Sequence, residues 1–266
     1  MANVLDIDDY ELGEARAIVT AFGSERFGYV VTPNVDHVIR YYRDPQFRAL
    51  YAQAAYVFLD SHFLAHILGF LKRRRHRVSP GSDLTAAVMY SVIKPNDVAV
   101  MVGGSAEQAQ ELRSRFGLKA LHHIDPPMNF IHDEVAVESC LRAIEAKSPF
   151  RFCFLAVGSP QQEIIALKLK ERGVARGLAL CIGASINFIT GVEKRAPQWM
   201  RKSGFEWLFR LVQSPKRLAK RYLVRGPRIF LLLPRIELRL RRPVAVPAAI
   251  QPISTSPISA ITGTHG

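Results

Sequence analysis

The chain has 266 residues, of which 48% are hydrophobic and 22% charged, and its formal net charge is +13. A hydrophobic share of this size supports a globular core and excludes disorder over most of the length. The three cysteines, Cys140, Cys153 and Cys181, form no disulfide framework, and no Cys/His spacing resembles a zinc site. We therefore expect buried thiols in a reducing compartment and no metal.

The positive charge is concentrated near the C-terminus. Residues 192–242 contain 15 Lys and Arg against three acidic residues, whereas the remainder contains 21 against 20. A local excess of cations is suited to phosphate, whether on a nucleotide, a nucleic acid or a lipid headgroup.

The sequence does not show the pattern of a secretory signal or of a membrane-spanning helix. The N-terminus is acidic where a secretory signal would be basic, and the chain has no run of 18 uncharged apolar residues. The run Ile229–Leu233 is too short to span a bilayer but suited to lie on one; an oligomer interface is its alternative. We expect a cytoplasmic protein, peripheral on the inner face of the membrane.

Buried strands alternate with helices along most of the chain, which predicts an α/β fold with a mostly parallel sheet. The runs that predict these strands occupy residues 27–32, 56–60, 97–104, 119–124, 151–158 and 179–183. The helical stretch after Asn34 is expected to break or kink at Pro45, with Asn34 as its N-cap.

Polar residues follow several of these strands, at the edge where open α/β sheets bind ligands. Thr32 ends the first run and Asn34 follows it, and simple turn and cap chemistry is their alternative role. Asp60 ends the second run, either as a catalytic or ribose-binding carboxylate or as the cap of the next helix. Gly103 and Gly104 allow a nucleotide to approach a helix N-terminus, although they do not form a dinucleotide fingerprint.

Changes of composition along the sequence predict that the chain has three parts. Residues 1–191 form an α/β catalytic core, and residues 192–242 form a basic helical appendage. Residues 243–266 contain no Lys, Arg, Asp or Glu and are expected to be a disordered tail.

Several loops, taken together, resemble the WecG/TagA/CpsF glycosyltransferase family of bacterial surface-polysaccharide synthesis. The resemblance covers roughly residues 4–225. Its motifs are TPN at 32–34, Asp60, PGSDL at 80–84, VGG at 102–104, VGSPQQE at 157–163, GASINFITG at 183–191 and the long block at 194–223.

The resemblance implies a Rossmann-like core whose appendage closes over the active site and touches the membrane. It implies transfer of a hexose or N-acetylhexosamine, such as an N-acetylmannosamine-type unit, from a UDP-sugar to an undecaprenyl-diphosphate-linked acceptor. The route is expected to be inverting, to give a β linkage and to need no metal.

Site residues are carried over by motif. Asp60 is the expected general base, with Thr32 and Asn34 beside it and Gln162 in the SPQQE loop. From the appendage, Arg210, Arg217 and Arg221 are expected to neutralise the leaving diphosphate, since arginine forks can replace a metal there. Their spacing would place them on one helical face unless Pro215 breaks it.

Three positions depart from the family pattern. Ser61 stands where the family usually has Gly. Asn187 replaces a carboxylate of the family's Phe-Asp-Phe and can still hydrogen-bond to the nucleotide. Arg77, the last of the expected substrate contacts, lies one residue farther from Gly81 than the family's arginine usually does.

Two other function classes are considered. A nucleic-acid-binding protein would use the basic segment, but its aromatic residues stand at apolar helix positions rather than interleaved for base stacking. A nucleotide-dependent oxidoreductase is disfavoured because the dinucleotide fingerprint is missing. We therefore expect no nucleic acid among the partners and leave a homo-oligomer open.

Overall fold

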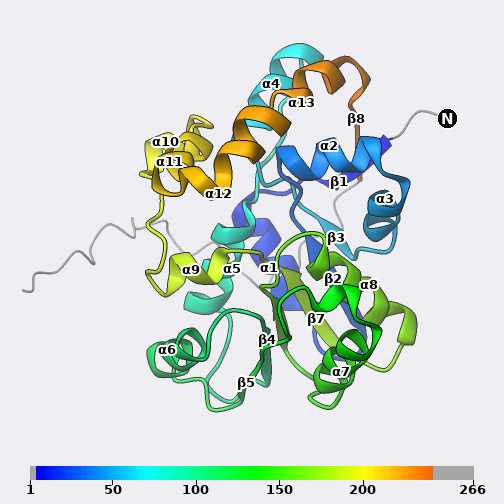
Figure 1. Ribbon diagram of the computed structural model, residues 1–266, viewed down its shortest axis with the longest axis vertical. Coiled ribbons are helices and arrows are strands. Elements are labelled where there is room, and N and C mark those ends of the chain that lie inside the picture. Colours follow the sequence, from blue (N-terminus) through cyan, green and yellow to red (C-terminus); the bar gives the residue numbers. More distant parts are fainter. Residues whose placement is uncertain (1–3, 242–266) are drawn as a thin grey trace, which may run out of the picture.

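The computed structural model describes residues 4–241, and the predicted tail at 243–266 lies outside this range. Six parallel strands form the main sheet in the order β3-β2-β7-β6-β4-β5 (Figure 1). Their bounds are β2 (Phe27–Val31), β3 (Tyr56–Val57), β4 (Ala99–Val102), β5 (Leu121–Ile124), β6 (Phe152–Leu155) and β7 (Gly177–Cys181). The predicted mostly parallel α/β fold is confirmed.

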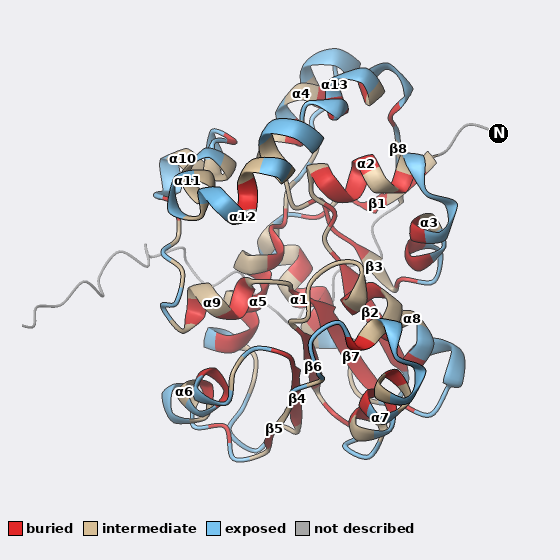
Figure 2. Cartoon of the chain, in the orientation of Figure 1, coloured by how far each residue is buried: buried red, intermediate tan, exposed pale blue. Residues whose placement is uncertain are grey.

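Helices cover both faces of this sheet and make a three-layer structure. One apolar cluster contains residues of α2 (Val35–Arg43), α3 (Pro45–Ala52), α4 (His62–Lys72), α7 (Glu134–Glu145) and α8 (Gln161–Arg172). The other contains residues of α1 (Leu12–Ala21), α5 (Gly81–Ser91), α6 (Ala106–Phe116) and α9 (Ser185–Ile189). Figure 2 shows the strands buried and the outer helix faces exposed.

Strand β6 shows how the sequence builds this core. Phe152 and Phe154 belong to one apolar cluster, while Cys153 and Leu155 belong to the other. Successive side chains of a strand point to opposite faces, so a strand covered on both sides is apolar throughout. All three cysteines are free and buried, as expected.

Local signals place two helix boundaries correctly. The Asn34 side chain accepts hydrogen bonds from the backbone N–H groups of Asp36 (3.0 Å) and His37 (3.3 Å), so it is the N-cap of α2. The helical stretch breaks between Arg43 and Pro45, where Asp44 caps α3 and Pro45 opens it.

The appendage is helical from Gln198 to Arg235, in six short pieces along one end of the molecule (Figure 1). They are α10 (Gln198–Lys202), α11 (Glu206–Gln213), α12 (Pro215–Ala219), the π-helix η2 (Lys220–Arg225), α13 (Arg228–Leu232) and the 3₁₀ turn η3 (Leu233–Arg235). A break at Ser214 and Pro215 separates Arg210 from Arg217 and Arg221. The three arginines therefore do not share one continuous helix.

The end of the appendage adds a strand that the sequence analysis did not anticipate. Strand β8 (Glu237–Arg241) pairs in parallel with β1 (Val4–Asp8) as a separate two-stranded sheet. Opposite charges match across this pair: Arg239 donates to both carboxylate oxygens of Asp6, at 2.5 and 2.7 Å.

The apolar run at 229–233 is only partly exposed, which corrects its interpretation as an exposed surface patch. Ile229 and Leu233 are buried in the same apolar cluster as α2, whereas Phe230 and Leu231 face outward. Within residues 4–241, no helix combines the length and the apolar character needed to span a bilayer.

Candidate functional site

The predicted site loops lie along one edge of the main sheet. Asp60 follows β3, Thr32 and Asn34 follow β2, Gly183 follows β7, and Gln162 follows β6. These four strands are neighbours in the order β3-β2-β7-β6 and all run in the same direction. Their carboxyl ends therefore meet at one edge, where open α/β sheets bind ligands.

Asp60 does not cap α4, so that alternative is wrong. The cap is Ser61, whose hydroxyl accepts a hydrogen bond from Leu64 N–H at 3.2 Å. The Asp60 backbone N–H donates to the Pro33 carbonyl (3.1 Å), and its Oδ1 accepts from the Gly81 N–H (2.7 Å). The carboxyl group is thus fixed between the loop after β2 and the first turn of α5.

Burial raises the pKa of Asp60 to about 6. The hydrogen bond from Gly81 opposes this shift, Glu206 adds to it, and Arg210 and Arg195 oppose it. A carboxyl group with a pKa near neutrality can accept a proton and release it again at physiological pH, which suits a general base. Three of the groups that act on it, Glu206, Arg210 and Arg195, belong to the appendage.

Gly81, whose N–H group binds the Asp60 carboxyl group, also contacts Thr32. A Cβ atom added to Gly81 would come within 2.4 Å of the Thr32 hydroxyl oxygen, so the two residues are in direct contact. The absence of a side chain at Gly81 allows the TPN and PGSDL loops to meet beside Asp60.

Asn34 has a second contact besides its capping role. Its Oδ1 accepts a hydrogen bond from Arg221 Nη2 at 3.2 Å. The Arg221 Nε lies 3.9 Å from the carboxylate of Asp36, which also pairs with Arg40 at 2.5 Å. The appendage is thereby joined to the loop after β2 by the arginine that the sequence predicted.

Arg210 lies near a second arginine that the sequence analysis did not select. The guanidinium groups of Arg210 and Arg195 lie 5.2 and 5.5 Å from the centre of the Phe188 ring. Arg210 also lies 3.6 Å from a carboxylate oxygen of Glu193. The face of an aromatic ring attracts a guanidinium group and so helps to fix its position. This contact does not use the N–H donors of the guanidinium group, which can still bind an acceptor.

Asp83, in the PGSDL loop, holds two arginines of the appendage. Its Oδ1 lies 2.6 Å from Arg195 Nη1 and 2.9 Å from Arg201 Nη1, and Arg195 also donates to the Ser82 hydroxyl at 2.6 Å. The sequence analysis missed Arg195, Arg201 and Asp83. Their position in the sequence was the available signal, because Asp83 lies in the PGSDL motif and both arginines lie in the motif block at 194–223.

Asn187 is part of an internal network. Gln108 Nε2 donates to its Oδ1 (2.9 Å), and Asn187 Nδ2 donates to Glu193 (3.0 Å). Because Glu193 also faces Arg210, Asn187 connects α6 to the appendage.

Gln162 is buried, and both ends of its amide have partners inside the protein. Its Oε1 accepts from the Gly183 N–H (2.8 Å) and its Nε2 donates to Glu163 (2.8 Å). Burial raises the pKa of Glu163, which opposes its ionisation. Gln162 therefore holds the loops after β6 and β7 together.

The remaining predicted residues differ in their surroundings. Gly103 and Gly104 both have positive φ, 82° and 74°, in the turn between β4 and α6, and lie against Val157 and Met101. Arg77 is exposed and pairs with Glu14 on α1 at 2.7 Å. The side chain of Arg217 lies outside the described part of the structure.

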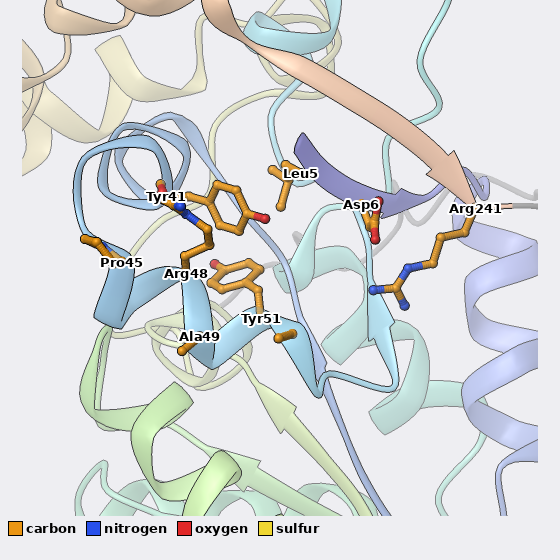
Figure 3. Close-up of a pocket in the computed structure, with 9 residues that line it drawn as sticks. Leu5, Asp6, Tyr41, Pro45, Arg48, Ala49, Tyr51 and Arg241 are labelled. Atoms are coloured by element: carbon orange, nitrogen blue, oxygen red, sulfur yellow. Dashed lines mark hydrogen bonds between the residues drawn. The ribbon is translucent and has the colours of Figure 1, made fainter. Parts of the chain in front are cut away.

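A cavity of about 410 Å³ lies elsewhere, between β1, α2 and α3 (Figure 3). Tyr41, Tyr51, Arg48 and Arg241 contribute to its lining, and none of the predicted site residues does. It is separate from the Asp60 site. In the range 4–241, His, Cys, Asp and Glu side chains form no group of three or more that could hold a metal ion.

The carboxyl edge of the parallel sheet presents Asp60, whose pKa is about 6, and Arg210 and Arg195 lower that pKa from the appendage. This arrangement fits an α/β transferase that acts on an anionic substrate. Comparison with protein families identifies which one. Residues 3–243 match the glycosyl transferase WecG/TagA/CpsF family, and the chain belongs to it. The protein is accordingly a glycosyltransferase of cell-envelope polysaccharide synthesis that uses a sugar donor and a glycan acceptor. This membership favours the glycosyltransferase interpretation over the nucleic-acid and oxidoreductase alternatives.

Proposed function

We propose that the protein transfers a hexose or N-acetylhexosamine from a UDP-sugar to a polyprenyl-diphosphate-linked acceptor, with inversion at the anomeric carbon. The observation that carries this proposal is a set of buried arginine donors in the appendage, on four arginines of which two, Arg195 and Arg210, act on the pKa of Asp60. The Nε–H groups of Arg195, Arg201, Arg210 and Arg221 are buried and have no hydrogen-bond acceptor among the described residues.

Buried donors without acceptors are uncommon because each one loses its hydrogen bond to water. Four of them in one appendage, on arginines that contact Asp83, Asn34 or the Phe188 ring, favour an anionic ligand with several oxygens. A nucleoside diphosphate fits this requirement, since arginine forks bind phosphate oxygens well. The arginines would then neutralise the charge that develops on departing UDP, so that a metal is not needed for this step.

Asp60 has the complementary role. In the proposed step its carboxylate takes the proton of the acceptor hydroxyl while that oxygen bonds to the anomeric carbon of the sugar. The bond between this carbon and the UDP oxygen breaks, and UDP leaves with the electron pair. Attack opposite the leaving group inverts the configuration and gives a β linkage from an α-linked donor. A pKa of about 6 lets Asp60 be ionised at neutral pH and still accept a proton.

We further propose that the protein works on the inner face of the cytoplasmic membrane. The support is the composition of the appendage, with 15 basic residues and exposed Trp199 and Phe205. Basic residues next to exposed aromatic side chains are typical of surfaces that contact anionic lipid.

The test is a panel of UDP-sugars, offered with a polyprenyl-diphosphate-linked glycan and with product mass as the readout. We expect one donor to add a single sugar to the acceptor, and the Asp60→Asn variant to add almost none. The proposal is wrong if no UDP-sugar gives product although UDP raises the melting temperature, since the ligand would then be bound for another purpose.

A further inference from the structure

A chain of hydrogen bonds with a fixed direction runs from the first turn of α6 to Arg210. The Ser105 backbone N–H donates to Gln108 Oε1 at 3.0 Å, so the Gln108 amide must direct its NH₂ group elsewhere. Gln108 Nε2 donates to Asn187 Oδ1 (2.9 Å), and Asn187 Nδ2 donates in turn to Glu193 Oε1 (3.0 Å). The other carboxylate oxygen of Glu193 lies 3.6 Å from Arg210 Nη2.

The second hydrogen of the Gln108 amide is also used inside the protein. Gln108 is buried, and its Nε2 donates to the Thr190 hydroxyl oxygen at 3.0 Å. That hydroxyl group donates its own proton to the Ile186 carbonyl at 2.9 Å, so it can only accept from Gln108. The Gln108 amide therefore has one allowed orientation. Asn187 must direct its oxygen toward Gln108 and its NH₂ group toward Glu193.

Arg210 is the point where this chain reaches the site. Its guanidinium group lies 5.2 Å from the centre of the Phe188 ring, and its charge opposes the rise in the pKa of Asp60. Its Nε–H group is buried and has no acceptor in the described part of the chain. Arg210 can therefore keep its contact with Glu193 and still bind a phosphate oxygen.

We propose that the chain from Gln108 to Glu193 positions Arg210 for the diphosphate, and that positions 187 and 193 must hold one amide and one carboxylate. Gln108, Asn187 and Glu193 are thus positioning residues. The inference rests on the proposed function, in which Arg210 binds the departing diphosphate, and it names the residues that hold this arginine in place.

The pairing can be tested by reversing it. Asn187→Asp removes the donor to Glu193 and sets two carboxylates within hydrogen-bond distance, where they resist being ionised together. Glu193 then moves away or takes up a proton, and Arg210 loses its partner in both cases. Glu193→Gln, with its oxygen still bound to the Asn187 amide, turns an NH₂ group toward Arg210.

Combining Asn187→Asp with Glu193→Gln restores the chain. The total charge is that of the wild type, because the carboxylate and the amide have only changed places. The carboxylate at 187 accepts from Gln108 as Asn187 does, and the amide at 193 donates to it and keeps its oxygen for Arg210. Only one hydrogen bond of the chain reverses its direction.

Calorimetry with UDP alone is the measurement. Asn187→Asp should weaken UDP binding about tenfold and Glu193→Gln about fivefold, because Arg210 is no longer held by a carboxylate. The double variant should bind UDP within about threefold of the wild type, since the effects of two residues in contact are not additive. In the transfer assay, kcat should fall in each single variant and recover in the double variant.

Asn96→Asp is the matched control, because it makes the same change at an exposed residue before β4, at the opposite edge of the sheet. It should leave UDP binding unchanged. The inference is overturned if the double variant binds UDP no better than Asn187→Asp, or if Glu193→Gln binds UDP more tightly than the wild type. If Asn187→Asp does not fold, the comparison of the double variant with Glu193→Gln decides.

This readout does not require sugar transfer. If no UDP-sugar gives product, the proposed function fails, and the pattern of UDP binding among the variants still decides the inference. If transfer occurs but the double variant shows no recovery, the proposed function stands and the inference fails.

Discussion

The α/β core and the appendage are held by different forces. Strands β4, β6 and β7 are buried along their whole length, and the core carries almost balanced charge. In the appendage, α10, α11 and η2 contribute no buried residue, and the chain is positioned by arginines that pair with Asp83, Glu193, Asp36 and Asn34. Salt does not screen apolar burial, whereas ion pairs near the surface weaken with salt and can be displaced by phosphate.

The difference suggests how the two parts share the work. The core presents Asp60 at a fixed place, and the appendage supplies cations whose present partners are exchangeable. The separation is incomplete, because β8 pairs with β1 and Ile229, Leu233 and Ile236 pack into the core. Deleting the appendage from residue 195 would therefore also damage the core.

The strongest effect is expected at Asp60, where the two parts meet. Asp60→Asn should lower turnover by about 10²–10⁴-fold, the usual span for loss of a general base. In the wild type, turnover should fall as the pH drops through about 6, because the carboxylate becomes protonated. A pH profile of turnover measures both effects. Unchanged turnover would assign Asp60 a purely structural role at the first turn of α5.

The same variant should affect stability in the opposite direction. The folded-state pKa of Asp60 is raised above its ordinary value, so ionisation in the folded protein costs free energy above about pH 6. Asp60→Asn should thus increase the free energy of unfolding near pH 8 by up to about 3 kcal/mol, and the gain should vanish below about pH 4. Urea denaturation at both pH values is the measurement.

Gly204 tests whether the appendage must sit close to α4. It has a φ of 83°, and a Cβ atom there would lie 2.9 Å from the backbone N and Cα of Phe63. Gly204→Ala should displace the turn between α10 and α11, cost about 1–3 kcal/mol of stability and lower turnover at least about tenfold.

Gly117→Ala is the control, since Gly117 also has a positive φ, 64°, but a Cβ atom there meets nothing within 4 Å. It should cost about 1 kcal/mol of backbone strain and leave turnover unchanged. Equal effects of the two variants on turnover would show that close contact with Phe63 is unimportant.

A smaller effect is expected at Asp83, which pairs with Arg195 and Arg201. Asp83→Asn should lower the free energy of unfolding by about 1 kcal/mol and accelerate tryptic cleavage near Arg201 and Lys202 several-fold. Glu138→Gln is its control, because Glu138 bridges Arg142 and Arg172 on the core surface. If cleavage near Arg201 were equally fast in both variants, the two parts would not differ in the way described.

Local features of the sequence were sufficient for most of the fold. Every strand of the main sheet except β5, which contains His122 and His123, is a short apolar run. Asn34 and Pro45 act on neighbouring backbone groups, so the sequence is enough to place these elements. The same holds for the loops of the site, because residues after parallel strands reach the same edge whatever their separation along the chain.

Only the tertiary structure decided which charges and apolar groups meet. Asp6 and Arg239 are 233 positions apart, and Arg195 and Asp83 are 112 apart, so no local pattern pairs them. Ile229 and Phe230 are neighbours in one apolar run, yet packing against α2 buries the first and leaves the second exposed. Sequence patterns report backbone preferences over a few residues, while the partner of a side chain depends on how distant elements pack.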